Sequence, residues 1–481
     1  MKPLSQTEKR NFVFIVVLLL TAAFSIPGKA AVWVSGPNTV NQAGIYGTKG
    51  TAGSNNVPGA RQEGVSWIDT NDRLWLFGGW GFDINGIDGA LNDLWRFDGK
   101  NWTWVSGANV VNQYGFYGSK GIQSLFNVPG ARYDSVSWID ESQNLWLFGG
   151  SNDDGDLFSD LWKYNGNYWI WISGPNAVDQ NGVYGTKGIP SGSNIPGARW
   201  GSISWIDLNG NFWLFGGYGR DGFGNTGNLN DLWKYNGTNW TWMSGSNAIN
   251  QSGIYGTKGI PAPTNVPGAR EKSISWIDQS GNLWLFGGRV VRIGISIDFL
   301  NDLWKFNGTN WTWVSGPNVI DQNGVYGTKG VAAGTNMPGA RGWSISWIDI
   351  HDNFWLFGGW GYDANGSGGE LNDLWKYDGT NWTWANGSNV RNQTGVYGTK
   401  GVFAATNIPG GRDSSISWID SSGNLWLFGG YGWDGTAQKT YSDLWKFLPC
   451  QMTGDFNGDC IVDFEDFSIF ATHWLEQGFP R

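Results

Sequence analysis

The sequence has little of what most metal centres and catalytic triads need. It holds 2 His and 2 Cys among 481 residues, and only 15% of its residues are charged. So few histidines exclude most transition-metal sites and most histidine-dependent catalysis. The formal net charge of -9 argues against nucleic acids and anionic membranes as partners, because both attract basic surfaces.

Two residue types are abundant instead. The chain contains 35 Trp and 76 Gly, which indicates one structural unit used many times. Hydrophobic residues make up 40% and aromatic residues 16% of the chain, enough for a large folded core and too much for a disordered protein.

The first thirty residues have the pattern of an export signal. Lys2, Lys9 and Arg10 precede an apolar run over residues 12–26, and small residues follow it near residue 30. We therefore predict a signal peptide over residues 1–30 and a secreted or cell-surface protein, with no membrane span after signal removal. An uncleaved anchor is the alternative.

One unit recurs six times along the chain. Its marker Leu/Phe-Trp-Leu-Phe-Gly-Gly has the first Gly at positions 78, 149, 216, 287, 358 and 429. Each unit also contains Ser-Trp-Ile-Asp before the marker, then Asp-Leu-Trp and a Trp-x-Trp run after it. These short aromatic and β-branched runs between turn residues predict four strands, a to d, in an antiparallel sheet.

The two ends of the repeat region complement each other. Residues 32–36 match a d strand without its a, b and c, and the last unit stops after its c strand at residue 447. We therefore predict an all-β fold over residues 31–449: a six-bladed β-propeller closed by its N-terminal strand.

These residues resemble the kelch superfamily, which includes propellers of the galactose oxidase type. The shared features are the Gly doublet after the second strand and a Tyr followed seven residues later by a Trp, as in Tyr235 and Trp242. The resemblance implies the fold and leaves enzymes and binding scaffolds open. It does not extend to copper-radical chemistry, because residues 31–449 contain one histidine, His351, and no cysteine.

Each unit here has about 71 residues, longer than the family's usual fifty or so, because a block with Gly-x-Tyr-Gly-Thr-Lys-Gly precedes strand a. Residues that follow the period are expected to be architectural. They are one Tyr, one Lys, one Arg and two Asp per unit. We expect the Asp of Asp-Leu-Trp, such as Asp93, to end the b-to-c loop by bonding backbone amides.

Residues that break the period are better candidates for a binding site, and those in the b-to-c loops attract attention. Aromatic planes beside hydrogen-bonding acids suit sugar rings. The ligand-binding candidates are Trp80, Asp83, Trp360, Tyr362, Asp363, Tyr431, Trp433 and Asp434. With Phe82, the aromatic members are expected to form one patch across neighbouring blades. The alternative is that they only cover the insertions. Of the remaining Trp, Trp200, Trp343 and Trp474 also lie outside the repeat.

The function predicted from these residues is an exported binding or attachment protein whose rim binds a glycan or an extracellular protein. The alternative is an extracellular polysaccharide-degrading enzyme, a glycoside hydrolase or lyase that uses rim carboxylates. Asp83, Asp88, Asp363 and Glu370 are the acids available for it. Whether the protein is an enzyme stays open at this point, and no catalytic residue is assigned.

The C-terminal segment, residues 450–481, has calcium-loop spacing. Five side chains and one carbonyl fall at the positions by which a loop wraps Ca²⁺: Asp455, Asn457, Asp459, Ile461 (carbonyl), Asp463 and Asp466. Apolar residues recurring every three to four positions follow, as on one face of a short helix. Cys450 and Cys460 flank the loop and suggest a disulfide. The segment resembles a single dockerin repeat, which implies calcium as cofactor and a cohesin-like or cell-surface partner.

Overall fold

The structure is a computed structural model that describes residues 31–291, 297–349, 351–404 and 406–447. All regular elements in these ranges are β-strands, which confirms the predicted all-β class. The expected signal peptide, the calcium loop from Asp455 to Asp466 and the pair Cys450 and Cys460 lie outside the described residues. Among the residues described, none forms a helix that could cross a bilayer.

Each repeat supplies four main strands. The a strands are β4 (Val65–Ile68), β8 (Val136–Ile139), β13 (Ile203–Ile206), β19 (Ile274–Ile277), β24 (Ile345–Ile348) and β29 (Ile416–Ile419). The b strands are β5 (Leu74–Phe82), β9 (Leu145–Phe148), β14 (Phe212–Phe215), β20 (Leu283–Val291), β25 (Phe354–Tyr362) and β30 (Leu425–Trp433).

The c strands are β6 (Asp88–Phe97), β10 (Leu161–Tyr164), β17 (Leu232–Tyr235), β21 (Ile297–Phe306), β26 (Gly368–Tyr377) and β31 (Gln438–Phe447). The d strands are β7 (Trp102–Ser106), β11 (Trp169–Ser173), β18 (Trp240–Ser244), β22 (Trp311–Ser315), β27 (Trp382–Asn386) and β1 (Ala31–Ser35). Short strands extend these sheets: β2 (Ala52–Gly53), β3 (Arg61–Gln62), β12 (Arg199–Trp200), β15 (Tyr218–Arg220), β16 (Thr226–Asn228), β23 (Arg341–Gly342) and β28 (Arg412–Asp413).

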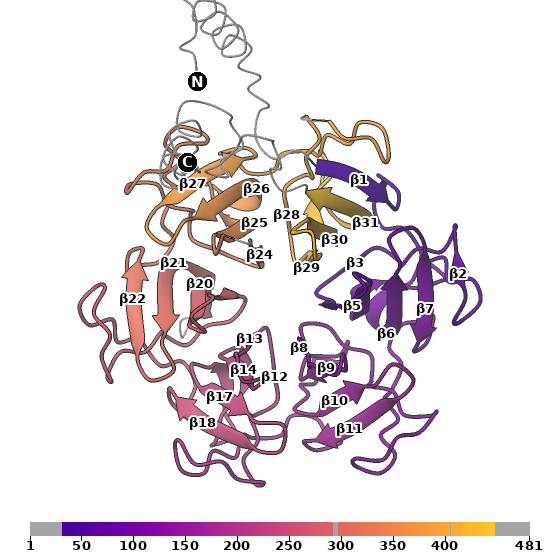
Figure 1. The fold of residues 1–481 in the computed structure, drawn as a ribbon, viewed down its shortest axis with the longest axis horizontal. Coiled ribbons are helices and arrows are strands. Elements are labelled where there is room, and N and C mark those ends of the chain that lie inside the picture. Colours follow the sequence, from indigo (N-terminus) through magenta and orange to yellow (C-terminus); the bar gives the residue numbers. More distant parts are fainter. Residues whose placement is uncertain (1–30, 292–296, 350, 405, 448–481) are drawn as a thin grey trace, which may run out of the picture.

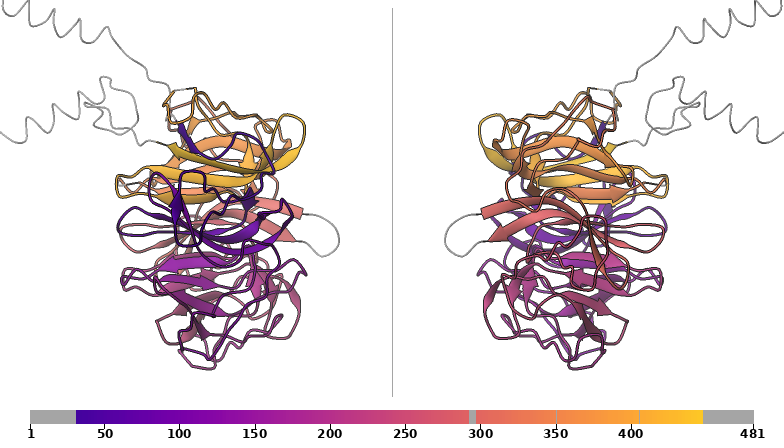
Figure 2. Two further views of the ribbon diagram at one scale, coloured as in Figure 1. Left: turned by 90° about the vertical axis from the view of Figure 1, so that its right-hand side faces the viewer. Right: turned by 90° about the vertical axis from the view of Figure 1, so that its left-hand side faces the viewer.

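Within each repeat the strands pair antiparallel in the order a, b, c, d. The sheets surround a common centre, with the a strands nearest to it and the d strands at the periphery (Figure 1). Seen from the side, their connections gather at two opposite faces (Figure 2). The arrangement is propeller-like.

The first strand of the described chain completes the sheet of the last repeat. β1 pairs antiparallel with β31, so that Ala31 lies opposite Phe447 and Trp33 opposite Trp445. In Figure 1 the indigo β1 accordingly lies beside the yellow β31.

The hydrophobic core lies between neighbouring sheets. Leu76 and Trp95 of the first repeat, for example, are buried in one cluster with Ile416 and Phe428 of the last. Residues 74–77 of β5 are all buried, because both faces of this part of the strand meet a neighbouring sheet. This explains why the b strands read as continuous apolar runs rather than as alternating ones.

Each insertion covers the outer edge of the sheet that follows it. β2 pairs with the edge strand β7. Tyr46 packs edge-on against Trp104, and the Lys49 ammonium lies 4.2 Å from the centre of the Trp104 ring. Lys49 also donates a hydrogen bond to the Gly107 carbonyl. Covering an edge strand in this way prevents its pairing with another chain.

The periodic arginines and tyrosines meet at the aspartate of Asp-Leu-Trp. Asp93 accepts a bidentate pair from Arg61 at 2.6 and 2.7 Å, and hydrogen bonds from the Tyr46 hydroxyl and the Trp95 indole. The expectation that this aspartate caps a loop through backbone amides is therefore wrong. Arg61 is fully buried, and a buried guanidinium needs a paired carboxylate, which strand c supplies.

Candidate functional site at the propeller axis

The predicted acids of the b-to-c loops are committed to their own turns. Asp83 is 1% exposed and accepts hydrogen bonds from the backbone amides of Asn85 and Ile87. Asp363 is equally buried and bonds the amides of Asn365 and Ser367 in the same way. These two carboxylates hold their loops, as short polar side chains do in turns.

Asp434 has the same environment in a more open loop. Its Oδ1 accepts hydrogen bonds from the backbone amides of Thr436 and Ala437 and from the Thr436 hydroxyl. The hydrogen bond from the Ala437 amide is the leading cause that lowers the pKa of Asp434. This acid is therefore ionised and occupied by its turn.

The predicted aromatic residues are half-buried and pack mainly against other parts of the molecule. Trp80 lies edge-on to Tyr133 at 5.5 Å between ring centres. Trp360 contacts Tyr362 at 6.3 Å and Phe299 at 4.9 Å. Among the described residues, no ring contact joins Trp80, Trp360 and Trp433 to one another. Tyr431 and Trp433, also half-buried, follow β28's partner segment in β30.

A different set of residues gathers at the centre. We call them the axial positions: the second residue after each repeat arginine, namely Glu63, Asp134, Gly201, Lys272, Trp343 and Ser414. They lie at the end of the sheets from which the b-to-c loops leave, because β3 pairs with the distal part of β5 at Trp80 and Gly81.

The backbone at the axial positions forms a continuous hydrogen-bonded circuit. The amide of each residue donates to the carbonyl of the axial residue in the preceding repeat, from Asp134 to Glu63 at 2.9 Å through to Glu63 to Ser414 at 3.0 Å. All six residues have a positive φ, between 53° and 64°. The repeated backbone thus directs six different side chains to one place.

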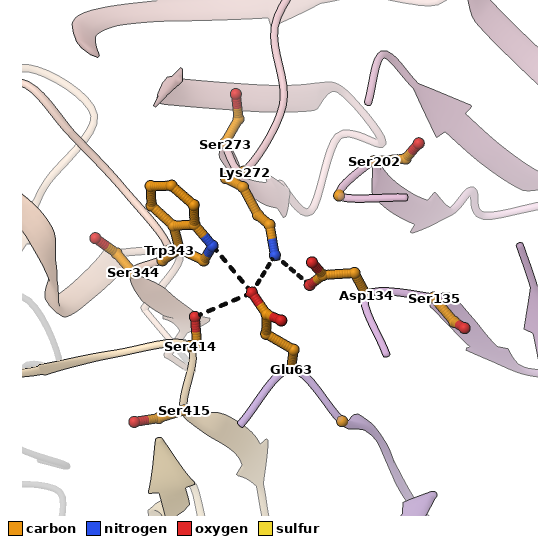
Figure 3. Close-up of a pocket in the computed structure, with 12 residues that line it drawn as sticks. Glu63, Asp134, Ser135, Ser202, Lys272, Ser273, Trp343, Ser344, Ser414 and Ser415 are labelled. Atoms are coloured by element: carbon orange, nitrogen blue, oxygen red, sulfur yellow. Dashed lines mark hydrogen bonds and ion pairs between the residues drawn. The ribbon is translucent and has the colours of Figure 1, made fainter. Parts of the chain in front are cut away.

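Lys272 reaches into the middle of this group. Its Nζ lies 2.8 Å from Glu63 Oε1 and also forms an ion pair with Asp134. Burial alone would lower the pKa of Lys272, but the two carboxylates raise it overall, so the ammonium is charged. Figure 3 shows the Lys272 ammonium between the two acids.

Glu63 is held by several partners at once. Its Oε1 accepts a hydrogen bond from the Trp343 indole at 3.2 Å, and the Ser414 hydroxyl lies at 3.5 Å (Figure 3). Burial and the nearby Glu63 charge raise the pKa of Asp134 well above its usual range. Of two acids on one lysine, Asp134 is therefore the one that holds a proton.

A second charged pair lies beside the first. Arg289 Nε is 2.5 Å from Glu271 Oε1, and Glu271 is fully buried. Burial raises the pKa of Glu271 to about 7, although Arg289 opposes the shift. Lys272 lies 5.1 and 5.5 Å from the ring centres of Trp200 and Trp343, and Arg289 lies 5.8 and 5.3 Å from the same two rings. The two cations are thus placed against two indole faces.

Two further buried acids share a proton next to the axis. Burial and the charge of Asp413 raise the pKa of Glu370 to about 10. Burial is also the leading cause that raises the pKa of Asp413 to about 7. Gln438 donates a hydrogen bond of 2.5 Å to Glu370 Oε1. Of the acids considered for catalysis from the sequence, Glu370 is therefore near the axis, whereas Asp88 lies exposed at the start of β6.

The axial positions and the residues after them line a cavity of about 150 Å³, the axial cavity. The flanking serines, such as Ser135, donate their hydroxyls to glycine carbonyls of strand b and are structural. The cavity is lined by Glu63, Gly64, Asp134, Ser135, Gly201, Ser202, Lys272, Ser273, Trp343, Ser344, Ser414 and Ser415. Within the described ranges, no group of three or more His, Cys, Asp or Glu residues is arranged to hold a metal ion.

Sequence reasoning missed this site, although a signal for it existed. Six repeats aligned on their arginine agree in most strand positions and differ in the two residues that follow it. Trp200 and Trp343 were noticed as exceptions to the repeat, but only the b-to-c loops were searched for ligands. One link between the two regions does exist, since Phe299 contacts both Trp360 and Trp343.

Comparison with known proteins yields no match to a protein-family model and none to a curated protein. Two solved structures are similar. One is the structure of YjhT, with a TM-score of 0.48 and 15% sequence identity over 81% of this chain and 95% of that chain. The other is a fungal alcohol oxidase of the AA5 family in complex with copper, with a TM-score of 0.44 and 10% identity over 85% of this chain and 78% of that one.

Proposed function

We propose that the chain is a six-bladed kelch-like β-propeller, closed by β1, that binds a carbohydrate on the face bearing the b-to-c loops, with the axial cavity at its centre. One observation carries the proposal. The axial positions share one backbone conformation but hold Glu63, Asp134, Gly201, Lys272, Trp343 and Ser414. A single ligand needs such asymmetry, and a repeated frame supplies it only where the repeat is broken.

The chemistry of this face suits a sugar. A sugar ring has an apolar face, which stacks on an indole, and hydroxyls, which bond to carboxylates and ammonium groups. Trp343 and Trp200 offer the first, and Glu63, Asp134 and Lys272 offer the second. The half-buried Trp80, Trp360, Tyr362, Tyr431 and Trp433, with Asp83, Asp363 and Asp434 in their loops, would extend the site outward.

The test is a glycan and protein array probed with the purified chain, followed by calorimetry with the strongest ligand. We expect Trp343→Ala and Trp360→Ala to weaken binding without lowering the melting temperature by more than a few degrees. Tyr114→Ala is the matched control, because Tyr114 is an aromatic residue 88% exposed on an outer insertion. Binding that is unchanged in both variants, or lost equally in the control, would remove the proposal.

The enzyme alternative rests on a separate observation. Carboxyl groups with raised pKa values cluster beside the axial cavity, and such groups often mark catalytic sites. A polysaccharide hydrolase or lyase using them would lose turnover in Asp134→Asn and keep it in Asp83→Asn, since Asp83 is bound within its turn. Absence of turnover across a broad polysaccharide panel would end this alternative.

The terminal segments add two proposals. We propose that the protein is exported and acts outside the cell or at its surface. We also propose that the dockerin-like segment binds calcium through Asp455, Asn457, Asp459, Ile461, Asp463 and Asp466 and docks to a cohesin-like or cell-surface partner. Calcium titration by calorimetry, with Asp455→Ala as control, tests the site, and a parent protein that gives no heat would refute it.

A further inference from the structure

The axial cavity lies in a region with more negative than positive groups. Five carboxyl groups surround it or interact with it: Glu63, Asp134, Glu271, Glu370 and Asp413. The cations that face these groups within the described chain are Lys272 and Arg289. Ionisation of all five acids would thus leave an excess of buried negative charge, which is costly unless compensated.

Some of these acids have oxygen atoms with no partner. Asp134 Oδ2, Glu271 Oε2 and Glu370 Oε2 are buried and accept no hydrogen bond. The Asp134 side chain is 8% exposed, lines the cavity and points toward its middle (Figure 3). A buried acceptor without a donor is unfavourable, so a ligand that supplies donors there gains what the free protein lacks.

Protons now compensate part of the charge. The pKa of Asp134 is raised well above its usual range, chiefly by burial, and burial likewise raises the pKa of Glu271 to about 7. A cationic group entering the cavity would replace these protons, because it stabilises the ionised carboxylates directly.

The indole rings provide a second, independent feature. Trp200 and Trp343 already lie with their rings 5.1 to 5.8 Å from Lys272 and Arg289. Indole faces attract cations, most strongly where water is excluded. The walls of the site are therefore suited to positive charge as well as to sugar rings.

We infer that the axial cavity binds a sugar carrying a protonated amine, an amino sugar at a chain end or on a short chain, in preference to neutral and acidic sugars. This inference rests on the proposed carbohydrate function and names its ligand class. An ammonium offers three donors and no acceptor, which matches the surplus of acceptors at Asp134 and Glu271. A cavity of about 150 Å³ is smaller than the roughly 300–1,000 Å³ typical of drug-sized ligands, so it suits one residue of a glycan.

The experiment compares two ligands that differ only in their acetyl groups: a chitosan trimer and the fully N-acetylated trimer. Calorimetry uses the full chain at mildly acidic pH, where the amines are protonated. We expect the chitosan trimer to bind at least about tenfold more tightly, as hydrogen bonds to charged groups imply. Titrations in two buffers of different ionisation enthalpy should show protons released by the protein.

Two variants of equal charge change separate the site from general attraction to an acidic protein. Asp134→Asn should weaken binding of the chitosan trimer about tenfold. Glu141→Gln, an exposed acid in the a-to-b turn at the other end of β8, should leave it unchanged. Equal effects of the two variants would overturn the inference.

The remaining outcomes distinguish the inference from the proposed function. Equal or tighter binding of the acetylated trimer would overturn the preference for an amine and leave carbohydrate binding in place. Binding of a simple alkylammonium with no binding of either trimer would keep the cationic site and overturn the carbohydrate function. Tighter binding of an oligogalacturonate than of the chitosan trimer would overturn the inference, because it requires the opposite charge.

Discussion

Trp343 shows how a repeat can create a unique site. Its φ of 58° lies in the left-handed region, which bulky residues rarely adopt. Its amide nevertheless bonds the Lys272 carbonyl at 3.1 Å, as the equivalent amides do around the axis. Such residues cost of the order of 1–3 kcal/mol each and are retained when the surroundings or the function require them. Only Gly201 takes this conformation without strain, so the other side chains point to a function.

At the residue scale, Glu271 gives a pH-dependent prediction. Its pKa is raised from 4.5 to about 7, mainly by burial, so the folded state binds more protons than the unfolded state between these values. Stability contributed by this group is therefore present at low pH and lost as the pH rises through about 7. We expect the melting temperature to fall across this window.

Glu271→Gln should flatten that fall, since glutamine keeps the shape and does not titrate. Melting curves recorded from about pH 4.5 to 7.5 in the parent and the variant provide the measurement. Asp413 acts in the same direction and stays unchanged in both proteins, so a slope that is identical in the two would contradict the role given to Glu271.

At the scale of the element, the buried Arg–Asp pair holds strand c, the insertion and the start of strand a together. In the third repeat Arg199 bonds Asp231 at 2.7 and 2.8 Å, and its remaining hydrogen bonds go to the carbonyls of Gly197 and Gly216. The Tyr184 hydroxyl binds the same aspartate from the insertion. One motif thus fixes three segments that are distant in sequence.

Breaking this pair should be severe. Arg199→Met leaves the Asp231 charge buried without its partner, and removal of one member of a buried pair costs about 3–5 kcal/mol. Urea denaturation followed by tryptophan fluorescence measures the loss. Lys187→Met is the control: Lys187 is exposed, bonds one carbonyl and lies over Trp242, so its loss should cost about 1 kcal/mol or less. Equal losses in the two variants would contradict the assignment.

At the scale of the whole molecule, the circuit of backbone hydrogen bonds and the pairing of β1 with β31 make the ends of the repeat region depend on each other. The environment of Trp33 in β1 is the same as that of Trp171 in β11. Each indole donates to a carbonyl two residues on at 3.0 Å, and each ring has a lysine ammonium 4.5 Å from its centre. The N-terminal strand is therefore built like an internal one.

This equivalence gives a matched pair of variants. If the ring unfolds as one unit, Trp33→Ala and Trp171→Ala should each lower the free energy of unfolding by a similar amount, of the order of 1–3 kcal/mol for half-buried residues. Chemical denaturation monitored by circular dichroism measures both. A much smaller effect of Trp33→Ala, or a separate early transition in that variant alone, would show that β1 is only loosely attached.

The sequence determined the elements of this protein because its repeat is written in residues that act locally. The runs around Trp67 and Trp75 predict strands wherever they occur, and the turn aspartate Asp69 does bond the amides of Asn71 and Arg73, as its position predicts. Residues 32–36 matched an unpaired d strand, so the partner of β1 could also be predicted.

Only the tertiary structure decided which side chains meet. Glu63, Asp134 and Lys272 come from three repeats, and their contacts depend on how sheets are rotated about the axis, which no local pattern specifies. The same holds for Asp93, whose partners Arg61 and Tyr46 come from other segments. Local sequence sets backbone conformation, whereas the closing of the ring brings together residues that lie up to hundreds of positions apart, as in the bond from Trp343 to Glu63.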